Sequence, residues 1–522
     1  MIISLIAVLT ILTGFSDVTD LNYLRIPVKV DFGHKLQLWD GFGVNYVETS
    51  QTFDYSEFAQ DYGGLSVLTE ADRREVIELI FGDDGLRPAL LKMFLDPLHQ
   101  QAPGGPYDHE TTTGNMRFFA KEGLKLTRSR GEDLSVITTL YSPPAYMTKQ
   151  RILRGRDIDP AHLEDMTDYM VNWVDFLRND QGLPVKYLSI HNEGESWQRW
   201  PPDGTLGHTL QAGHDYNYFC TPELMNELIV RLRKSLDERE LSNVGVTNGE
   251  PTNWYRFGAW GYAHALVSDE EALNSLGLIT SHGFYVGNIQ SGRWFGPHSR
   301  NGTEMLLRHR PGLHVWTTSS AWDLKYDRCP GDGGPQYREY IMNAAFLKEV
   351  HGNIYEAGVN AYIPWACMQR ESHWNRPDPN PGTAIRVHDD GSWEVNKGYY
   401  FYKNVTRAGY PGMAVAYTHA MDSDIAVIAF SSNGTTNPDA FVVVNFGNIE
   451  KHLNIEVDGS GYNDYKTYIT TGSQSYLIDK GLQEMTDQEH NYVSNGGHTL
   501  AGGAIQYTAP PNSATTFIGI KP

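Results

Sequence analysis

Short apolar runs alternate with amphipathic segments from about Asp40 to Arg370. In residues 222–240, leucines recur at every fourth position, and Thr221 is placed to cap the start of a helix. Similar helix-like segments span residues 70–81, 163–178 and 337–351. The apolar runs have the length of buried strands, and they span residues 41–46, 89–95, 134–140, 185–190, 244–247, 276–280, 313–316 and 359–365. Eight buried strands alternating with helices predict an α/β fold, the (β/α)8 TIM barrel.

After about Tyr399 the pattern changes to short β-branched runs with Gly, Asn and Asp between them. These runs span residues 425–430, 440–446, 453–457 and 465–471. They predict the strands of an appended antiparallel β-sandwich. Residues 23–38 are also strand-like and are expected to pair with the sandwich. The predicted domains are therefore N-terminal strands at 21–39, a catalytic barrel at 40–395 and a β-sandwich at 396–522.

The first fifteen residues form one apolar run, and polar residues 16–20 follow it. The run is short for a membrane span and lies at the amino end, so residues 1–16 are predicted to be a secretory signal peptide. No later run reaches eighteen apolar residues. We therefore expect a secreted protein, extracellular or periplasmic, with no membrane partner in its mature form.

The composition limits which classes of molecule the protein is expected to bind. The 522 residues are 40% hydrophobic, 12% aromatic and 20% charged, which is typical of a globular protein. The net charge of −21 disfavours nucleic acid and anionic membranes but leaves neutral polysaccharides open. The three cysteines do not form a disulfide scaffold, although Cys220 and Cys329 could pair. We find no metal-binding motif and predict no metal, no cofactor and a monomer.

In a (β/α)8 barrel, the residues that follow each strand form the active site. The fourth apolar run is followed by His191-Asn192-Glu193, the fifth by Asn248-Gly249-Glu250 and the sixth by His282. Carboxylates, amides, an imidazole and indole rings are thus expected at one mouth. Rings stack on the apolar faces of sugars and polar groups bond their hydroxyls, so this mixture favours a carbohydrate site.

Several motifs occur in the order and at the strand ends of a known family. They are Asp40-Gly41-Phe42-Gly43, Ser142-Pro143-Pro144-x-x-Met147, Asn192-Glu193, Glu250-x-x-Asn253-Trp254, His282, Trp316-x-Thr318 and the tail from Tyr507 to Phe517. Together they resemble glycoside hydrolase family 30, of clan A, from about residue 25 onward. The resemblance implies a glycosidase with a barrel and a side β-sandwich.

Family 30 enzymes are retaining and use two glutamates, one after strand four and one after strand seven. The chemistry needs two carboxyls about 5 Å apart, one protonated and one ionised. Glu193, preceded by Asn192, matches the acid/base position. A solvated loop acid is the alternative for Glu193, and Glu195 is more typical of a rim or supporting acid.

The seventh strand departs from the family pattern Trp-x-Thr/Ser-Glu, because Ser319 occupies the nucleophile position. A serine without an adjacent base does not attack an acetal at a useful rate. Two neighbours differ as well: Phe284 stands where the family often has tyrosine, and Lys92 stands where an arginine is expected. Three departures around one point indicate a remodelled site.

A second carboxylate could come from elsewhere, and Glu250 is the first candidate for the catalytic base, although hydrogen bonding to sugar hydroxyls or to the loop carrying Trp254 is the stronger interpretation. Asp323, Glu371 and Asp96 are the others, with Asp96 more typical of a structural role. A carboxylate about 6.5–9.5 Å from the acid would suit an inverting mechanism. Inversion is slightly favoured, and retention through an unrecognised nucleophile stays open.

Further residues are expected to bind the sugar, with Trp365 as the floor of the subsite. The others are Asn45, Tyr141, Asn192, Trp254, His282, Tyr285, Ser319 and Glu371, and Trp197 and Trp200 could form a wall of the cleft. The resulting prediction is a secreted glycosidase acting on a poly- or oligosaccharide. The alternative is an inactive carbohydrate-binding protein on the same scaffold. Retention of Glu193 and of the Ser142–Met147 loop favours the enzyme.

Overall fold

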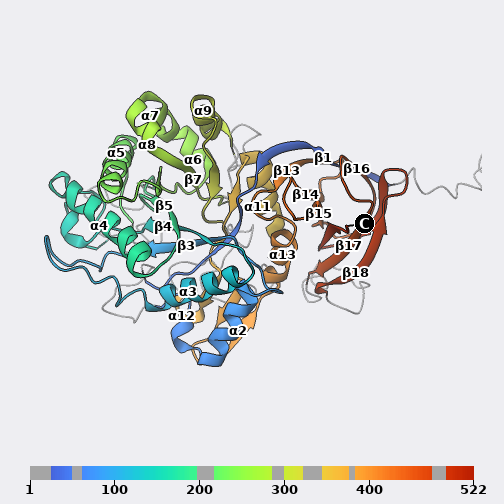
Figure 1. Ribbon diagram of the computed structural model, residues 1–522, viewed down its shortest axis with the longest axis horizontal. Coiled ribbons are helices and arrows are strands. Elements are labelled where there is room, and N and C mark those ends of the chain that lie inside the picture. Colours follow the sequence, from blue (N-terminus) through green and yellow to red (C-terminus); the bar gives the residue numbers. More distant parts are fainter. Residues whose placement is uncertain are drawn as a thin grey trace, which may run out of the picture.

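A computed structural model describes residues 25–49, 61–153, 155–196, 217–284, 299–320, 344–374, 383–472 and 490–521. A barrel with its surrounding helices lies beside a large sheet formed mainly by the last hundred residues (Figure 1). The residues of the predicted signal peptide lie outside the described part of the chain.

Eight parallel strands close the barrel in chain order. They are β2 (Gly41–Asn45), β3 (Leu90–Leu95), β4 (Ser135–Leu140), β5 (Val185–Ser189), β6 (Gly245–Thr247), β7 (Leu276–Ser281), β8 (Val315–Thr317) and β9 (Ala361–Tyr362). Each predicted apolar run overlaps one of them. The prediction of a (β/α)8 barrel is therefore confirmed.

Helices surround the barrel (Figure 1). They are α2 (Glu70–Phe81), α3 (Gly114–Ser129), α4 (Leu163–Asp175), α5 (Pro222–Glu238), α6 (Trp254–Ala259), α7 (Tyr262–Ser268), α8 (Glu270–Ser275), α9 (Asn301–His309), α11 (Phe346–His351), α12 (Glu371–Trp374) and α13 (Lys397–Thr406). In α5, Thr221 caps the first turn by accepting a bond from the Leu224 amide, and Leu228, Leu232 and Leu236 are buried. The amphipathic pattern therefore sets which face covers the barrel.

Apolar side chains form a cluster inside the barrel, namely Leu90, Ile137, Leu278, Trp316, Ala361 and Ile363. The Trp316 indole donates to Asp40 Oδ2 at 2.6 Å, and Asp40 directly precedes β2. This bond lies at the amino-terminal end of the strands. A filled interior at that end leaves the carboxyl ends as the place where polar groups can gather.

Nine strands form the second sheet: β1 (Ile26–Leu38), β13 (Ala414–Ala420), β14 (Ile425–Ser431), β15 (Ala440–Asn445), β16 (Lys451–Asp458), β17 (Asp464–Thr471), β18 (Asn491–Thr499), β19 (Ala504–Ala509) and β20 (Ser513–Gly519). Their order is β18-β17-β20-β15-β14-β13-β1-β16-β19. The first strand pairs antiparallel with β13 and parallel with β16. The chain thus enters the sheet before it builds the barrel.

This sheet bends over a core of its own. Tyr507 on β19, an edge strand, bonds Thr515 on β20 at 2.6 Å, and its ring lies 5.2 Å from that of Phe517. Because β20 is third from the opposite edge, the two ends of the sheet meet across buried residues such as Val30 and Ile455. Two layers with a shared apolar interior are the arrangement of a sandwich.

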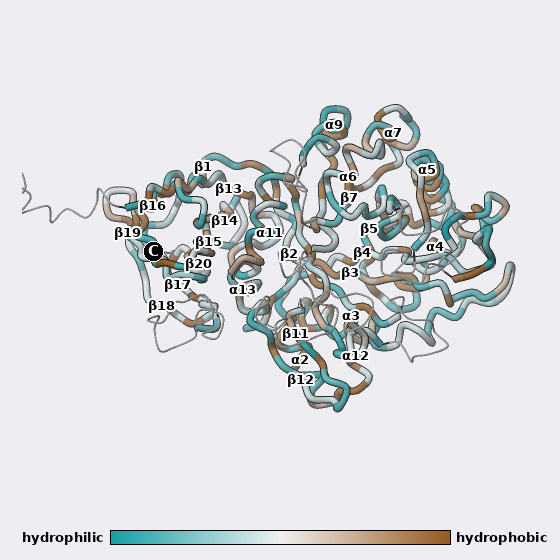
Figure 2. Tube along the Cα trace, turned by 180° about the vertical axis from the view of Figure 1, so that it is seen from behind, coloured by the Kyte–Doolittle hydropathy of each residue, from teal (hydrophilic) through white to brown (hydrophobic). Residues whose placement is uncertain are grey.

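Helix α13 joins the two bodies and lies between them when the molecule is seen from behind (Figure 2). Tyr402 donates to the Gly43 carbonyl of β2 at 2.7 Å. Asn404 donates to Thr470 and accepts from Thr516 on the sheet. The barrel and the sheet are therefore connected by buried polar contacts as well as by apolar packing.

A small sheet of β10 (Met368–Arg370), β11 (Ile385–Val387) and β12 (Trp393–Val395) lies beside α2, where the Trp393 indole donates to Asp72 at 3.1 Å. Within the described ranges, no helix combines the length and the apolar character that a membrane span requires.

Candidate active site

Two glutamates are placed side by side where β5 and β6 end. The Glu193 amide donates to the Glu250 carbonyl at 2.7 Å, and the Glu250 amide donates to the His191 carbonyl at 3.0 Å. Asn192 and Glu250 form a parallel bridge that continues the strand pairing past β5 and β6. Backbone pairing therefore fixes both residues at the barrel mouth.

His282, just after β7, lies between the two carboxylates. Its Nδ1 is 3.1 Å from Glu193 Oε1, and its Nε2 is 3.0 Å from Glu250 Oε2. Burial alone would lower the pKa of His282, but the bonds to the two glutamates outweigh burial and raise it. The protonated ring carries a hydrogen on each nitrogen, so it can donate to both carboxylates at once.

Glu250 is fully buried and both of its oxygens are occupied. Oε2 takes hydrogen bonds from Lys92 and His282, and Oε1 takes one from the Thr139 hydroxyl. Burial would raise the pKa of Glu250, but the charge of Lys92 and the bond from His282 outweigh burial and bring it to about 2. Glu250 therefore favours its ionised form, in which it accepts hydrogen bonds from Lys92, His282 and Thr139. Its geometry argues against the role of catalytic base expected from the sequence, and it is better described as a positioning residue.

Glu193 is 5% exposed and has a backbone φ of +49°. Left-handed backbone is uncommon for a residue with a side chain and clusters at functional sites. The next residue, Gly194, leaves no space for a larger one, because an added Cβ would lie 2.9 Å from atoms of Cys220 and His191. The loop that carries Glu193 is thus held in one conformation.

His191 lies under this loop and is completely buried. Its Nδ1 accepts the Gly194 amide hydrogen at 3.1 Å. Burial lowers the pKa of His191 to about 4, so the ring is neutral at physiological pH. His191 therefore supports the loop of Glu193, and the pKa of His191 is lowered whereas that of His282 is raised.

Ser319 follows β8 and is 1% exposed. Its carbonyl accepts the Gly283 amide hydrogen at 2.7 Å, but its hydroxyl has no hydrogen-bond partner among the described residues. Lys92 reaches the neighbouring Thr318 carbonyl at 3.3 Å. No histidine or lysine of the described ranges is bonded to the Ser319 hydroxyl, as expected for a serine that is not a nucleophile.

Two of the aromatic candidates gather around Phe94 on β3. The Phe94 ring lies 5.0 Å from that of Tyr141 and 5.8 Å from that of Trp365, and the Lys92 ammonium lies 4.9 Å from its centre. Trp365 is 5% exposed. These rings therefore adjoin the cation that binds Glu250.

Three other predicted residues have partners of their own. Trp254 is fully buried in α6 and its indole donates to Thr317 and Asn353, so it packs between helices and barrel and is not placed to bind a sugar. Glu371 is paired with His388 at 2.8 Å beside the small sheet. Asn45 ends β2 beside Lys92 of β3, and its side chain accepts the Cys367 amide hydrogen at 2.9 Å.

Tyr285, Asp323, Trp197, Trp200 and Cys329 lie outside the described residues. Asp96, at the end of β3, accepts bonds from Thr49, Thr112 and His99, which fits the structural role expected for it. The role of Thr139 was not predicted. A polar residue within the apolar run 134–140 is the signal that could have indicated it.

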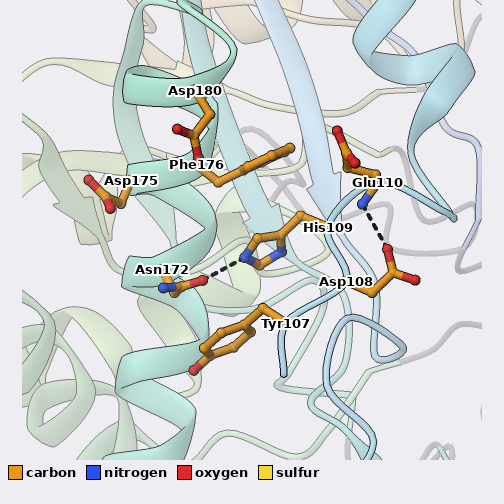
Figure 3. A pocket seen from close by; sticks show the side chains of 8 residues that line it. All are labelled: Tyr107, Asp108, His109, Glu110, Asn172, Asp175, Phe176 and Asp180. Atoms are coloured by element: carbon orange, nitrogen blue, oxygen red, sulfur yellow. Dashed lines mark hydrogen bonds between the residues drawn. The ribbon is translucent and has the colours of Figure 1, made fainter. Parts of the chain in front are cut away.

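A separate cavity of about 350 Å³ lies outside the barrel between α4 and the segment that precedes α3 (Figure 3). His109 lines it and bonds Asn172 at 2.7 Å and His99 at 2.8 Å, and His99 bonds Asp96. Burial lowers the pKa of His109 to about 4. This series of hydrogen bonds, from Asp96 to Asn172, thus connects α4 to the end of β3.

In chemical terms, the mouth holds a carboxyl group, Glu193, whose hydrogen-bond partner is a histidine with a raised pKa. Such a group can give a proton to a leaving oxygen or take one from water. In the described part of the chain, no set of three or more His, Cys, Asp or Glu side chains could hold a metal ion. The catalytic potential of this cluster lies in proton transfer.

Neither a family model nor a curated protein matches the chain. Solved structures do match over most of its length. The catalytic domain of a family 30 xylanase C from Talaromyces cellulolyticus is 15% identical, with a TM-score of 0.65, covering 95% of this chain and 100% of that one. A family 30 subfamily 8 xylanase from Clostridium acetobutylicum is 17% identical, with a TM-score of 0.64 and the same coverages. An endo-β-1,6-glucanase is 15% identical, with a TM-score of 0.64, covering 95% and 94%. The chain shares the fold of these glycoside hydrolases.

Proposed function

We propose that the protein is a glycoside hydrolase acting on a poly- or oligosaccharide, with Glu193 as its general acid/base. The observation that carries this proposal is the contact between Glu193 and His282. A buried glutamate in left-handed backbone, bonded to a histidine that a second glutamate keeps charged, is a costly arrangement. Such arrangements cluster at functional sites. The likeness of the fold to glycoside hydrolases supports the same function.

The contact explains how Glu193 could act as an acid. When the protonated carboxyl gives its hydrogen to the leaving oxygen, negative charge develops on Glu193. His282 already points a hydrogen at Oε1, so the new charge meets a donor that needs no reorganisation. This interaction is stronger in the transition state than before it, which is the condition for catalysis. Glu250 contributes by raising the pKa of His282, and Lys92 contributes by holding Glu250 in place.

The second carboxylate is left unassigned, and two routes follow from that. In one, an unrecognised nucleophile gives retention; in the other, an activated water gives inversion. Glu250 fits neither role while Lys92, His282 and Thr139 occupy its oxygens. Proton NMR of fresh product separates the routes. A first-formed anomer with the configuration of the substrate requires a nucleophile, and the opposite anomer requires a water.

The proposal is tested by measuring sugar release from a panel of neutral and acidic polysaccharides. With the polysaccharide that the wild type degrades, Glu193→Gln should lower the rate about 100- to 10,000-fold, the usual contribution of general acid–base catalysis. Glu227→Gln, an exposed change on α5, serves as the matched control and should leave the rate unchanged. Equal rates for wild type and Glu193→Gln would refute the assignment.

One observation favours a second candidate, a carbohydrate-binding protein without hydrolytic activity. The strand-seven position of the family nucleophile is Ser319, whose hydroxyl has no partner among the described residues. A protein of this kind would bind a glycan that it leaves intact during prolonged incubation. Binding without any turnover on the whole panel would favour this candidate over the enzyme.

We also propose that the protein is exported. The basis is the amino-terminal apolar run, followed by polar residues. Expression of the full chain in a secreting host should yield a product that begins after about residue 16. Recovery of the uncleaved chain inside the cell would refute export.

A further inference from the structure

A cavity of about 240 Å³ lies where the side sheet meets the barrel. Arg87, just before β3, contributes to it from the barrel, and Arg407 from the end of α13. Lys466 and Tyr468 on β17 and Tyr492 on β18 contribute from the sheet. Arg87 precedes a barrel strand, whereas Glu193 follows one, so this cavity and the candidate active site lie at opposite ends of the barrel.

The charge of this cavity contrasts with that of the whole chain. Three cations line it against one carboxylate, Asp84, although the protein carries a net charge of −21. Asp84 is already paired with Lys403 at 3.1 Å. A local excess of positive charge gives this cavity a potential that attracts anions.

Contacts within the described part of the chain use only some of the hydrogen-bond donors of these cations. Arg407 donates to the Asp83 carbonyl at 2.7 Å and has no ion pair within the described ranges. Lys466 likewise has no ion pair within that part of the chain, and its ammonium lies 5.7 Å from the centre of the Tyr468 ring. Arg87 is paired with Glu132, but its Nε finds no acceptor among the described residues. Guanidinium groups bind carboxylate and sulfate through paired hydrogen bonds.

Aromatic rings form the walls. The rings of Tyr468 and Tyr492 are stacked, with centroids 4.9 Å apart and planes within 7°. Tyr410 lies under Arg87, at 5.3 Å from the guanidinium carbon. Tyrosine combines an apolar face with a hydroxyl at its edge. A simple inorganic anion would use the cations but would gain nothing from three rings.

We propose that this cavity binds one acidic unit of an oligosaccharide, such as a uronic acid. Its carboxylate meets Arg407 and Lys466, and its hydroxyls meet the edges of the tyrosines, whose faces contact one another and the cations Arg87, Lys403 and Lys466. Pockets for drug-sized ligands occupy about 300–1,000 Å³, so this smaller one suits a single sugar unit. The site holds the glycan apart from the catalytic cluster, and binding does not depend on whether the chain hydrolyses it.

The test is calorimetric titration of the full chain carrying Glu193→Gln, which keeps the probe intact. Trigalacturonic acid is the probe, and its fully methyl-esterified form is the neutral control with the same rings. The acid should bind at least tenfold more tightly than the ester at low ionic strength, since only the acid offers carboxylates to Arg407 and Lys466. Added salt should weaken binding of the acid more than binding of the ester.

Pocket variants then locate the binding. In the same background, Arg407→Gln and Lys466→Gln should each weaken trigalacturonate about tenfold. Lys125→Gln, an exposed change on α3, should have no effect. Three results would overturn the proposal: equal affinity for acid and ester, unchanged affinity in both pocket variants, or inorganic phosphate alone binding as tightly as the trimer.

Discussion

The two sides of the barrel mouth differ in how fully their buried polar groups are hydrogen-bonded. On the side of β5, β6 and β7, Glu193, Glu250 and His282 form a continuous buried network that Lys92 completes from β3. At the end of β8, Ser319 has a buried hydroxyl without a partner among the described residues. The first side holds several charges in fixed positions, and the second holds none at the position where family 30 enzymes have a carboxylate.

This difference supports the proposal that Glu193 is the acid/base. The residues around Glu193 stabilise one another, and such arrangements cluster at functional sites. The Ser319 hydroxyl has no such partners among the described residues, and Lys92 is bonded to Glu250. Under the proposed function, we therefore expect hydrolysis to depend on the side of Glu193.

The largest expected effect comes from removing the cation of the network. Lys92→Met leaves Glu250 buried without its main partner, which should lower the free energy of unfolding by about 3–5 kcal/mol. Urea denaturation measures this loss. The double variant Lys92→Met/Glu250→Gln removes both charges and should recover most of it. A loss below about 1 kcal/mol in the single variant would mean that the network is not held by this pair.

Replacing His282 should remove the side chain that connects the two glutamates by hydrogen bonds. His282→Ala should lower kcat about 100- to 1,000-fold, the cost of losing one donor aimed at developing charge, with little change in KM. Its pH profile supplies a readout that a purely structural role would not move. Without a positive neighbour, Glu193 should stay protonated to higher pH, so the alkaline limb of kcat/KM should shift upward. An unshifted profile would contradict the role given to His282.

The network also predicts how stability depends on pH. The pKa of Glu250 is depressed to about 2 in the folded chain, so its contribution is present above its ordinary value near 4.5 and is lost as pH falls toward 2. The pKa of His282 is raised, so its contribution is complete below about 6.5 and is lost as pH rises through the folded value. The urea midpoint should be highest between about pH 4.5 and 6.5. If His282→Ala and wild type lost the same stability between pH 6.5 and 9, the assignment to His282 would be wrong.

The smallest effect is expected on the other side of the mouth. Ser319→Ala removes a buried hydroxyl that bonds nothing among the described residues, so stability should change by less than about 1 kcal/mol. Hydrolytic activity should be largely retained. A rate loss comparable with that of Glu193→Gln, or a sugar trapped on Ser319, would show that the two sides share the chemistry.

Much of this arrangement could be predicted from the chain alone. Buried strands are mainly apolar, so the apolar runs located all eight barrel strands, and the strand ends then located Glu193, Glu250 and His282. The contacts of Glu250 with Lys92 and Thr139 could not be predicted in this way, because these two residues lie within two other strands whose register is set by closure of the barrel. Trp254 was misplaced for a similar reason. Its position after a strand suggested the mouth, but capping of α6 by Asn253 turns its ring into the helix layer.

The central claim is that Glu193 transfers the proton to the leaving group. The most direct test compares Glu193→Gln with wild type on two glycosides of the same sugar, one with an unactivated alcohol and one with a dinitrophenolate that leaves without protonation. We expect a loss of about 100- to 10,000-fold on the first and a far smaller loss on the second. Equal losses on both substrates, or no loss on the first, would contradict it.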